Sequence, residues 1–330
     1  MRATYLFSAA VLLLQIHLFP KHVADPLKPL TAVVLPGIEG PIQRMAADVK
    51  GQRIFLAATV KDSVEIYDPQ TLKHLGSIKG LSQPQDIAFD STNGTLLVTN
   101  GGDGSLRTYD GTTLKLINTK LMGGDADRLR LTADGKAVYV GWGVGSLAII
   151  DLKSGARSDV KLKSHPDGFQ LDTTGNRIFV NLPGVQEVAE IDRWSHTVFT
   201  SWPVHPFREN GPMALDEANR RIFVVCHKPA KLLVMNMEDG VVTASMSTAA
   251  DADDVFYDRE RKRIYVVGGE GFIAVYRQKG PDEYSSIGSV ETLPGARNGL
   301  LVPEWNRFFV VARNRPPFEP AELQSFSVVD

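Results

Sequence analysis

A short apolar run of β-branched and aromatic residues recurs seven times along the chain, each time after a turn. Examples are Arg53–Leu56, Arg177–Val180 and Arg263–Val266. The first apolar residues of the seven runs stand at positions 54, 96, 138, 178, 222, 264 and 308, so the period is 40 to 44 residues. The runs are bounded by Gly, Asn and Asp and lack the three- and four-residue apolar spacing of a helix. The pattern therefore predicts a β-repeat protein.

Each repeat carries signals for four strands. An inner strand such as Asp86–Phe89 precedes a tight turn such as Asn93-Gly94, whose residues tolerate positive φ. The apolar run follows, then a third strand ending in a polar residue, as in Leu106–Asp110, and a more polar fourth strand such as Thr71–Leu75. Four strands in roughly 40–45 residues are typical of a propeller blade. We predict an all-β, seven-bladed β-propeller of four-stranded blades; six blades plus an irregular cap is the alternative, because the last repeat has a longer loop, Asn314–Glu322.

The two ends of the chain predict how the ring closes. The seventh repeat stops at Asp330, after its third strand. The segment Leu30–Leu35 precedes the first inner strand and has the composition of a strand. We expect this N-terminal strand to complete the last blade, which would leave no open edge between the ends of the ring.

The repeats resemble a known family. The tetrapeptide Leu97-Val98-Thr99-Asn100 is close to the sequence that names the YVTN repeats, and the pattern over residues 30–330 is similar to the YncE-like, YVTN-type seven-bladed propellers. It is not the WD-repeat pattern, because Tyr67-Asp68 stands where Trp-Asp would be. The resemblance implies exported proteins that are mostly binding modules. Related propellers include lactonases and subunits of quinoprotein and nitrite-reducing enzymes, but none of their catalytic motifs carries over, and a shared fold does not assign a reaction.

The first 24 residues have the pattern of a secretory signal peptide. Arg2 precedes an apolar run from Ala3 to Phe19, and the small residue Ala24 stands before a polar chain. An uncleaved N-terminal anchor is the alternative. No later stretch reaches the roughly 18 apolar residues of a membrane span. We therefore predict a secreted or periplasmic protein in which residues 25–330 form a single propeller domain.

Composition narrows the function classes. The formal net charge is −2, from 36 basic and 38 acidic residues, so no global basic field favours nucleic acid. The single cysteine, Cys226, excludes an internal disulfide and a cysteine-based zinc site. Gly-x-Ser-x-Gly, His-Glu-x-x-His and Cys-x-x-Cys-His motifs are absent from the sequence. The missing catalytic motifs favour a non-enzymatic protein. We expect a monomer whose protein or small-molecule partner is unidentified.

The candidate functional residues lie in the loops that enter the inner strands. In a propeller these loops surround the mouth of the central channel. The repeats align on equivalent residues at Asp48, Asp90, Thr132, Asp172, Asp216, Asp258 and Val302. In each repeat we consider the residues seven and five positions before this aligned residue. They are two residues apart, so on an extended chain both side chains can point to the same side. They are Pro41 and Gln43, Gln83 and Gln85, Asp125 and Asp127, His165 and Asp167, Glu209 and Gly211, Asp251 and Asp253, and Gly295 and Arg297. Four consecutive blades thus present carboxylates and one histidine.

These residues predict a site for a cation or a cationic ligand. Carboxylates from neighbouring strands can supply the oxygen ligands of calcium, and the candidate metal ligands are Asp125, Asp127, His165, Asp167 and Asp253. A histidine among carboxylates can instead favour a transition metal or act as a general base. In the alternative interpretation the acids cap loop amides and pair with Arg44, Arg128 and Arg297, with Asp254 and Asn298 also within reach.

The wider predicted ligand-binding set comprises Asp125, Asp127, Arg128, His165, Asp167, Glu209, Asp251, Asp253, Arg297 and Trp142. Trp142 lies in the hairpin Gly141–Gly145, where an exposed ring among cations would suit an anionic or aromatic ligand and a buried one would pack between blades.

Three functions follow from these features. The first is an exported binding module that uses its channel-mouth face. The second is a lactonase-like, metal-assisted hydrolase with His165 as base. The third is the propeller subunit of a periplasmic redox complex, for which a large exposed apolar patch would be expected.

Overall fold

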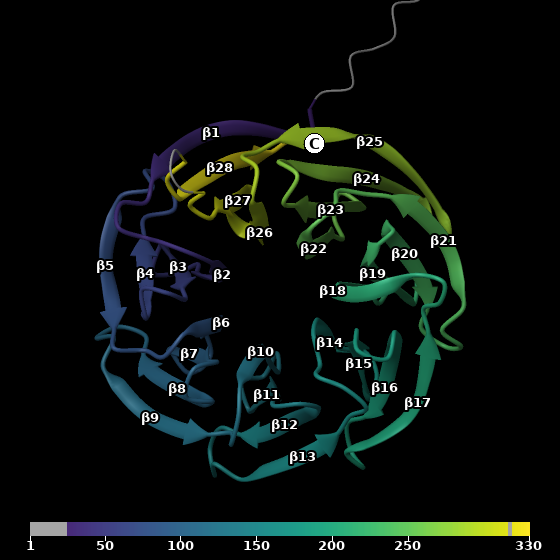
Figure 1. The fold of residues 1–330 in the computed structure, drawn as a ribbon, viewed down its shortest axis with the longest axis horizontal. Coiled ribbons are helices and arrows are strands. Elements are labelled where there is room, and N and C mark those ends of the chain that lie inside the picture. The colour runs from purple at the N-terminus through teal and green to yellow at the C-terminus, as the bar shows by residue number, and fades with distance from the viewer. Residues whose placement is uncertain (1–24, 316–318) are drawn as a thin grey trace, which may run out of the picture.

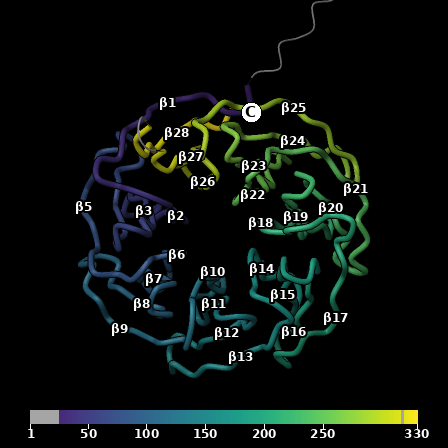
Figure 2. Tube along the Cα trace, viewed as in Figure 1, coloured from purple at the N-terminus to yellow at the C-terminus, as the bar shows by residue number. Residues whose placement is uncertain are grey.

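Seven four-stranded antiparallel sheets surround a common axis in the computed structural model, which describes residues 25–315 and 319–330 (Figure 1). The chain passes once around the ring, blade after blade (Figure 2). The seven-bladed, all-β prediction is confirmed, and the alternative of six blades with a cap is wrong. Within the described residues the one helical element is a short 3-10 turn, Pro303–Trp305. None of the helices in this part of the chain has the length and apolarity to cross a membrane.

The blades are numbered here in chain order, and each runs from the axis outward. Blade 1 contains β2 (Ile42–Asp48), β3 (Arg53–Ala58), β4 (Ser63–Tyr67) and β5 (His74–Lys79). Blade 2 contains β6 (Pro84–Asp90), β7 (Thr95–Asn100), β8 (Ser105–Asp110) and β9 (Leu116–Leu121). Blade 3 contains β10 (Ala126–Leu131), β11 (Ala137–Trp142), β12 (Ser146–Asp151) and β13 (Arg157–Lys161). Blade 4 contains β14 (Phe169–Leu171), β15 (Arg177–Leu182), β16 (Glu187–Asp192) and β17 (Thr197–Pro203).

The remaining blades follow the same plan. Blade 5 contains β18 (Arg208–Asp216), β19 (Arg221–Lys228), β20 (Ala230–Asn236) and β21 (Val242–Ser247). Blade 6 contains β22 (Ala252–Asp258), β23 (Arg263–Gly268), β24 (Phe272–Gly280) and β25 (Glu283–Glu291). Blade 7 contains β26 (Ala296–Val302), β27 (Arg307–Ala312), β28 (Glu322–Val328) and β1 (Leu27–Val34).

The N-terminal strand closes the ring, as its sequence predicts. Strand β1 pairs antiparallel with β28, from Leu27 opposite Val328 to Val34 opposite Glu322. The strand begins three residues before the predicted Leu30. Most of its side chains face solvent, but Leu27 and the following Leu35 are buried between blades. Closure thus depends on backbone pairing and on these two anchors.

Neighbouring blades pack through one repeated position, the second apolar residue of each second strand. Its side chain is buried against the next blade around the ring. It is aromatic in six blades, namely Phe55, Tyr139, Phe179, Phe223, Tyr265 and Phe309. Large apolar side chains at a repeated position therefore hold successive sheets together.

The polar residue after most third strands has a local role. Asp68 and Asp110 each accept hydrogen bonds from the backbone N–H and the hydroxyl of a threonine three residues on. Asp151 and Asp192 do the same with serines. These hydrogen bonds hold the pKa of all four carboxyls below the usual range. The repeated late Asp is thus a turn cap.

Residues 1–24, the predicted signal peptide, lie outside the described residues. Export and cleavage therefore stay predictions.

Candidate functional site

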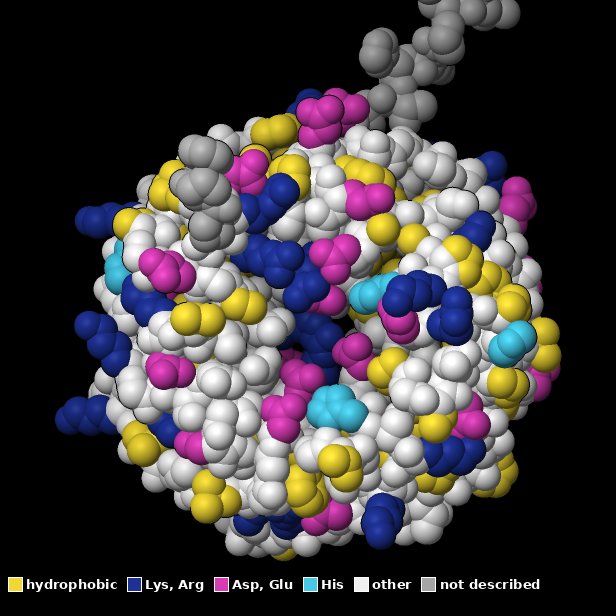
Figure 3. All heavy atoms as spheres, in the orientation of Figure 1, with side chains coloured by type: hydrophobic (Ala, Val, Ile, Leu, Met, Phe, Trp, Pro, Cys, Tyr) yellow, Lys and Arg dark blue, Asp and Glu magenta, His cyan; other side chains and the backbone are white. Residues whose placement is uncertain are grey.

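The predicted mouth residues surround one opening in the face of the ring. The inner strands β2, β6, β10, β14, β18, β22 and β26 line the axis (Figure 1). Acidic, basic and histidine side chains gather around the central opening (Figure 3). Charged side chains that the sequence places on different blades therefore meet at one end of the channel.

A β-bulge widens the set of side chains that reach the axis. In six of the seven inner strands the pairing register shifts near the start of the strand, for example between Ala252 and Asp254 in β22. A bulge breaks the alternation of side chains, so consecutive residues can face the same side. For this reason Asp253 and Asp254 both interact with arginines near the axis.

Arg44 is the central cation of this network. Its Nη1 lies 2.7 Å from Oδ1 of Asp254 and donates to Oδ1 of Asn298 at 2.5 Å. Asn298 in turn donates to the carbonyl of Ile42 at 3.0 Å. Burial acts to lower the pKa of Arg44, but Asp254, Asp253 and two further aspartates outweigh it and raise the pKa. Arg44 thus joins blade 1 to blades 6 and 7 as a permanent cation.

Two aspartates, the buried Asp86 and the half-buried Asp254, connect adjacent blades. Oδ2 of Asp254 accepts the backbone N–H of Gly299 at 2.9 Å, and Oδ2 of Asp86 accepts that of Leu129 at 3.0 Å. The two residues occupy equivalent positions in blades 6 and 2. Burial raises the pKa of Asp254 to about 6, against the opposing effect of Arg44, and it also raises the pKa of Asp86. The two carboxylates thus hold blade 6 to blade 7 and blade 2 to blade 3.

Three further cations of the inner-strand region are each paired with carboxylates. Arg128 donates from Nε and Nη2 to Oδ1 of Asp167, at 3.1 and 2.7 Å. Arg297 contacts Asp251 at 3.0 Å and Asp253 at 2.8 Å. Lys228 contacts Glu209 at 2.6 Å. The alternative in which the acids pair with Arg44, Arg128 and Arg297 therefore describes the arrangement in the structure.

Two carboxylates of the channel, Asp127 and Asp167, are reached by solvent although protein atoms surround them closely. The side chains of Asp127 and Asp167 are 30% and 31% exposed, yet protein surrounds them closely enough for burial to raise the pKa of both. The two observations agree if water reaches these groups only along a narrow channel. A charged ligand entering the channel would meet carboxylates with little water around them, where electrostatic attraction is stronger than in bulk solvent.

His165 links this acidic region to the hairpin of blade 3. Its Nδ1 lies 2.5 Å from the carbonyl of Gly143, and its Nε2 lies 3.4 Å from Oδ2 of Asp127. Both ring nitrogens face acceptors, which suits the doubly protonated ring. The contact with Asp127 is the main cause that raises the pKa of His165 to about 9. At neutral pH this side chain is a cation.

We predict that His165 titrates near pH 9. Because its pKa is raised in the folded state, its stabilising contribution is complete below about pH 6.5 and is lost as the pH rises towards 9. In Asp127→Asn the midpoint should fall towards 6.5. The imidazole resonances of His165, followed by NMR across this pH range, would measure the midpoint. A wild-type midpoint at or below 6.5 would contradict the prediction.

Asp125 differs from the other mouth acids. It is exposed, and among the described residues its carboxylate takes part in no ion pair or hydrogen bond. Its backbone carbonyl accepts the N–H of Gly143, which fixes its position beside the blade 3 hairpin. The carboxylate lies close to Gly101 and to the Gln85 amide.

Trp142 lies apart from the ion pairs. Its Nε1 donates to Asp159 at 2.9 Å, and the guanidinium of Arg157 lies 4.6 Å from its ring centroid. The ring also packs against the core between blades 2 and 3. These contacts match the interblade packing that the sequence left open for this residue.

The structure also identifies a residue that the sequence argument missed. Asp86 was absent from the predicted set, although an aspartate recurs at the equivalent position as Asp254. That recurrence is the signal that could have identified it. In the described part of the chain, no three His, Cys, Asp or Glu side chains are grouped as a metal site would require. The calcium prediction remains untested.

Comparison with known proteins confirms the fold but assigns no function. No protein-family model and no curated protein matches the sequence. Among 1790 matching chains of solved structures is one of Kuenenia stuttgartiensis hydrazine synthase. It is 15% identical, with a TM-score of 0.65, and the match covers 84% of this chain and 96% of that one. At this identity the likeness shows a shared β-propeller fold alone, and so many matches mark a fold that hosts many functions.

Proposed function

We propose that this propeller is a binding module whose channel mouth receives a cationic group of a ligand or partner. The observation that carries the proposal is the unpaired carboxylate of Asp125 beside a network in which each of the other carboxylates contacts a cation. Six carboxylates and four cations, counting protonated His165, surround the opening, so two negative charges are in excess. The carboxylates are Asp125, Asp127, Asp167, Glu209, Asp251 and Asp253, and the cations are Arg128, His165, Lys228 and Arg297.

The backbone around the opening supports this proposal. Gln83, Glu209 and Asp251 adopt φ of 51°, 56° and 52°, and the equivalent residue of blade 7 is Gly295 at 84°. A residue other than glycine in this conformation costs roughly 1–2 kcal/mol. At two mouth positions an acidic residue thus adopts a backbone conformation that glycine would adopt at a lower conformational free energy. Strained backbone is found at binding sites, although here it also occurs in turns elsewhere.

The resemblance to YVTN-type propellers agrees with a binding role, and with export through residues 1–24. The hydrolase alternative gains nothing from His165, because a general base must be unprotonated and its pKa is raised to about 9.

The test uses two probes of similar length and opposite charge. Calorimetric titration with 1,6-diaminohexane should show binding, whereas adipate should not bind at the mouth. Asp125→Asn should weaken diamine binding about tenfold, which corresponds to ~1.4 kcal/mol. Asp239→Asn, in the turn between β20 and β21, is the matched control and should bind as the wild type does. Calcium forms a parallel arm, because a metal ion is the other cation that the carboxylates suit.

The outcomes separate the alternatives. Calcium binding that is lost in Asp125→Asn would make the cation a metal. If neither the diamine nor calcium binds, or if Asp125→Asn binds like the wild type, the proposed function is wrong.

A further inference from the structure

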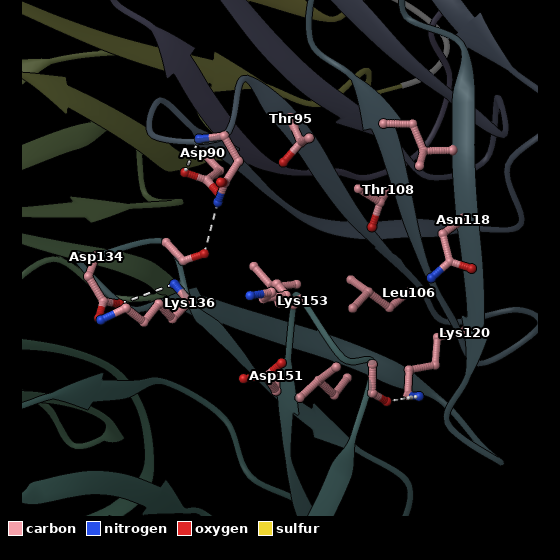
Figure 4. A pocket seen from close by; sticks show the side chains of 16 residues that line it. Asp90, Thr95, Leu106, Thr108, Asn118, Lys120, Asp134, Lys136, Asp151 and Lys153 are labelled. Carbon is pink, nitrogen blue, oxygen red and sulfur yellow. Dashed lines mark hydrogen bonds and ion pairs between the residues drawn. The ribbon is translucent and has the colours of Figure 1, made fainter.

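A second cavity lies away from the channel mouth, between blades 2 and 3. Its volume is about 590 Å³, within the range of small-molecule sites. Blade 2 contributes Thr95, Leu106 and Thr108 (Figure 4). Blade 3 contributes Ile150 and Leu152.

The cavity exists because blade 2 departs from the repeat. In five other blades an arginine opens the second strand, and in blades 1, 4 and 6 it reaches across to a carbonyl of the next blade. Arg53 donates to Gly111 and Arg177 donates to Met237, both at 2.7 Å. In blade 2 this position is Thr95, which is too short to reach, and the corresponding carbonyl belongs to Leu152. The space that an arginine occupies elsewhere is therefore open.

The next packing position is also reduced. Blade 2 has Leu97 where the other six blades have an aromatic residue. Blade 3 lacks the arginine too, with Ala137, but there the guanidinium of Arg193 from blade 4 lies 5.8 Å from the ring centroid of Tyr139. Blade 2 thus combines a missing arginine with a missing aromatic ring.

The acidic residues around the cavity are already engaged. Asp90 accepts hydrogen bonds from the turn residue Asn93, and Asp151 accepts them from Ser154. Asp134 pairs with Lys136 at 2.9 Å. These hydrogen bonds fix the carboxylates in place, and the three lysines of the lining, Lys120, Lys136 and Lys153, balance their formal charge.

The remaining polar groups favour an anion. Within the described residues, the ammonium of Lys153 has no hydrogen-bond or ion-pair partner, and neither do the hydroxyls of Thr95 and Thr108. Ile117 is 59% exposed at the same cavity, and Leu106, Ile150 and Leu152 add apolar surface. The cavity thus offers one free cation, two hydroxyls and an apolar wall.

We propose that this cavity binds a small amphipathic anion, an aliphatic or aromatic carboxylate whose apolar body covers the wall while its charge meets Lys153. The site is independent of the channel mouth and takes a ligand of opposite charge.

Octanoate, 1-octanol and octylammonium test the proposal, because they share one apolar chain and differ in charge. Binding to the purified protein, measured by calorimetry, should be tightest for octanoate and weakest for octylammonium. Lys153→Gln should weaken octanoate binding about tenfold and leave octanol unchanged. Lys231→Gln on blade 5 and Asp125→Asn at the mouth are controls that should bind octanoate like the wild type.

Filling the cavity gives a stricter test. Thr95→Arg restores the arginine of the other blades and should abolish binding of all three probes while the melting temperature stays equal or rises. Thr108→Phe, which fills the same space differently, should also abolish binding and covers the case in which the first variant fails to fold. Equal affinities for the three probes, no octanoate binding at millimolar concentration, or binding that survives in a folded filled variant would overturn the proposal.

Discussion

Replacing Arg44 with methionine is expected to lower the free energy of unfolding by about 3–5 kcal/mol, because it leaves buried carboxylates without their cation. The Arg44 side chain is 9% exposed and contacts Asp254 at 2.7 Å. Burial raises the pKa of Asp254 to about 6 even with Arg44 present, and the variant should raise it further. Urea denaturation at pH 7 would measure the loss.

The effect of Arg44→Met should depend on pH. A carboxyl whose pKa is raised in the folded state stabilises most below its unfolded pKa, about 4, and loses this contribution as the pH rises through its folded value. The variant should therefore be less destabilised at pH 4.5 than at pH 7. Adding Asp254→Asn should restore much of the loss, because it removes the unpaired charge.

Arg297→Met provides the comparison for Arg44→Met. Its side chain is 25% exposed, so its ion pairs should contribute less than about 1 kcal/mol. Equal losses for Arg44→Met and Arg297→Met would contradict a special role for the buried cation.

Deleting residues 25–35 should open the ring. The deletion removes β1 and exposes the edge of β28, and it also removes Leu27 and Leu35, each 1% exposed. Burial of two leucine side chains contributes roughly 3–6 kcal/mol, to which the lost strand pairing adds. The free edge should also promote association. Denaturant midpoints and size-exclusion chromatography would show both effects.

Point variants separate the anchor from the rest of the strand. Leu27→Ala should cost about 2–5 kcal/mol, whereas Leu30→Ala, at an exposed position of the same strand, should change stability by less than about 0.5 kcal/mol. A deleted protein that remains monomeric with an unchanged midpoint would contradict closure by β1.

The fold could be predicted from the sequence because it is a property of repetition. Seven apolar runs such as Ile54–Leu56 mark the second strands, and the missing fourth strand of blade 7 directs attention to the N-terminus. The ends of the strands are predicted less accurately than the strands themselves. The fourth strand of blade 1 begins at His74, not at Thr71, because Asp68 holds a turn that continues through Thr71.

The candidate site could be predicted only in part. Alternation places Asp125, Asp127 and their equivalents on one mouth, but it cannot show the bulges that bring Asp254 and Arg44 to the axis as well. Nor can it show which charges pair, since Arg44 of blade 1 meets Asp254 of blade 6 across blade 7. The cavity between blades 2 and 3 does have a sequence signal, Thr95 in place of arginine, which becomes meaningful once the role of Arg53 is visible.

A crystal structure with 1,6-diaminohexane bound would test the central claim most directly, namely that the channel mouth receives a cation. We predict one ammonium group within hydrogen-bond distance of the Asp125 carboxylate, with the pairs Arg128–Asp167 and Arg297–Asp253 unchanged. A diamine bound only elsewhere on the protein, with Asp125 free, would contradict it.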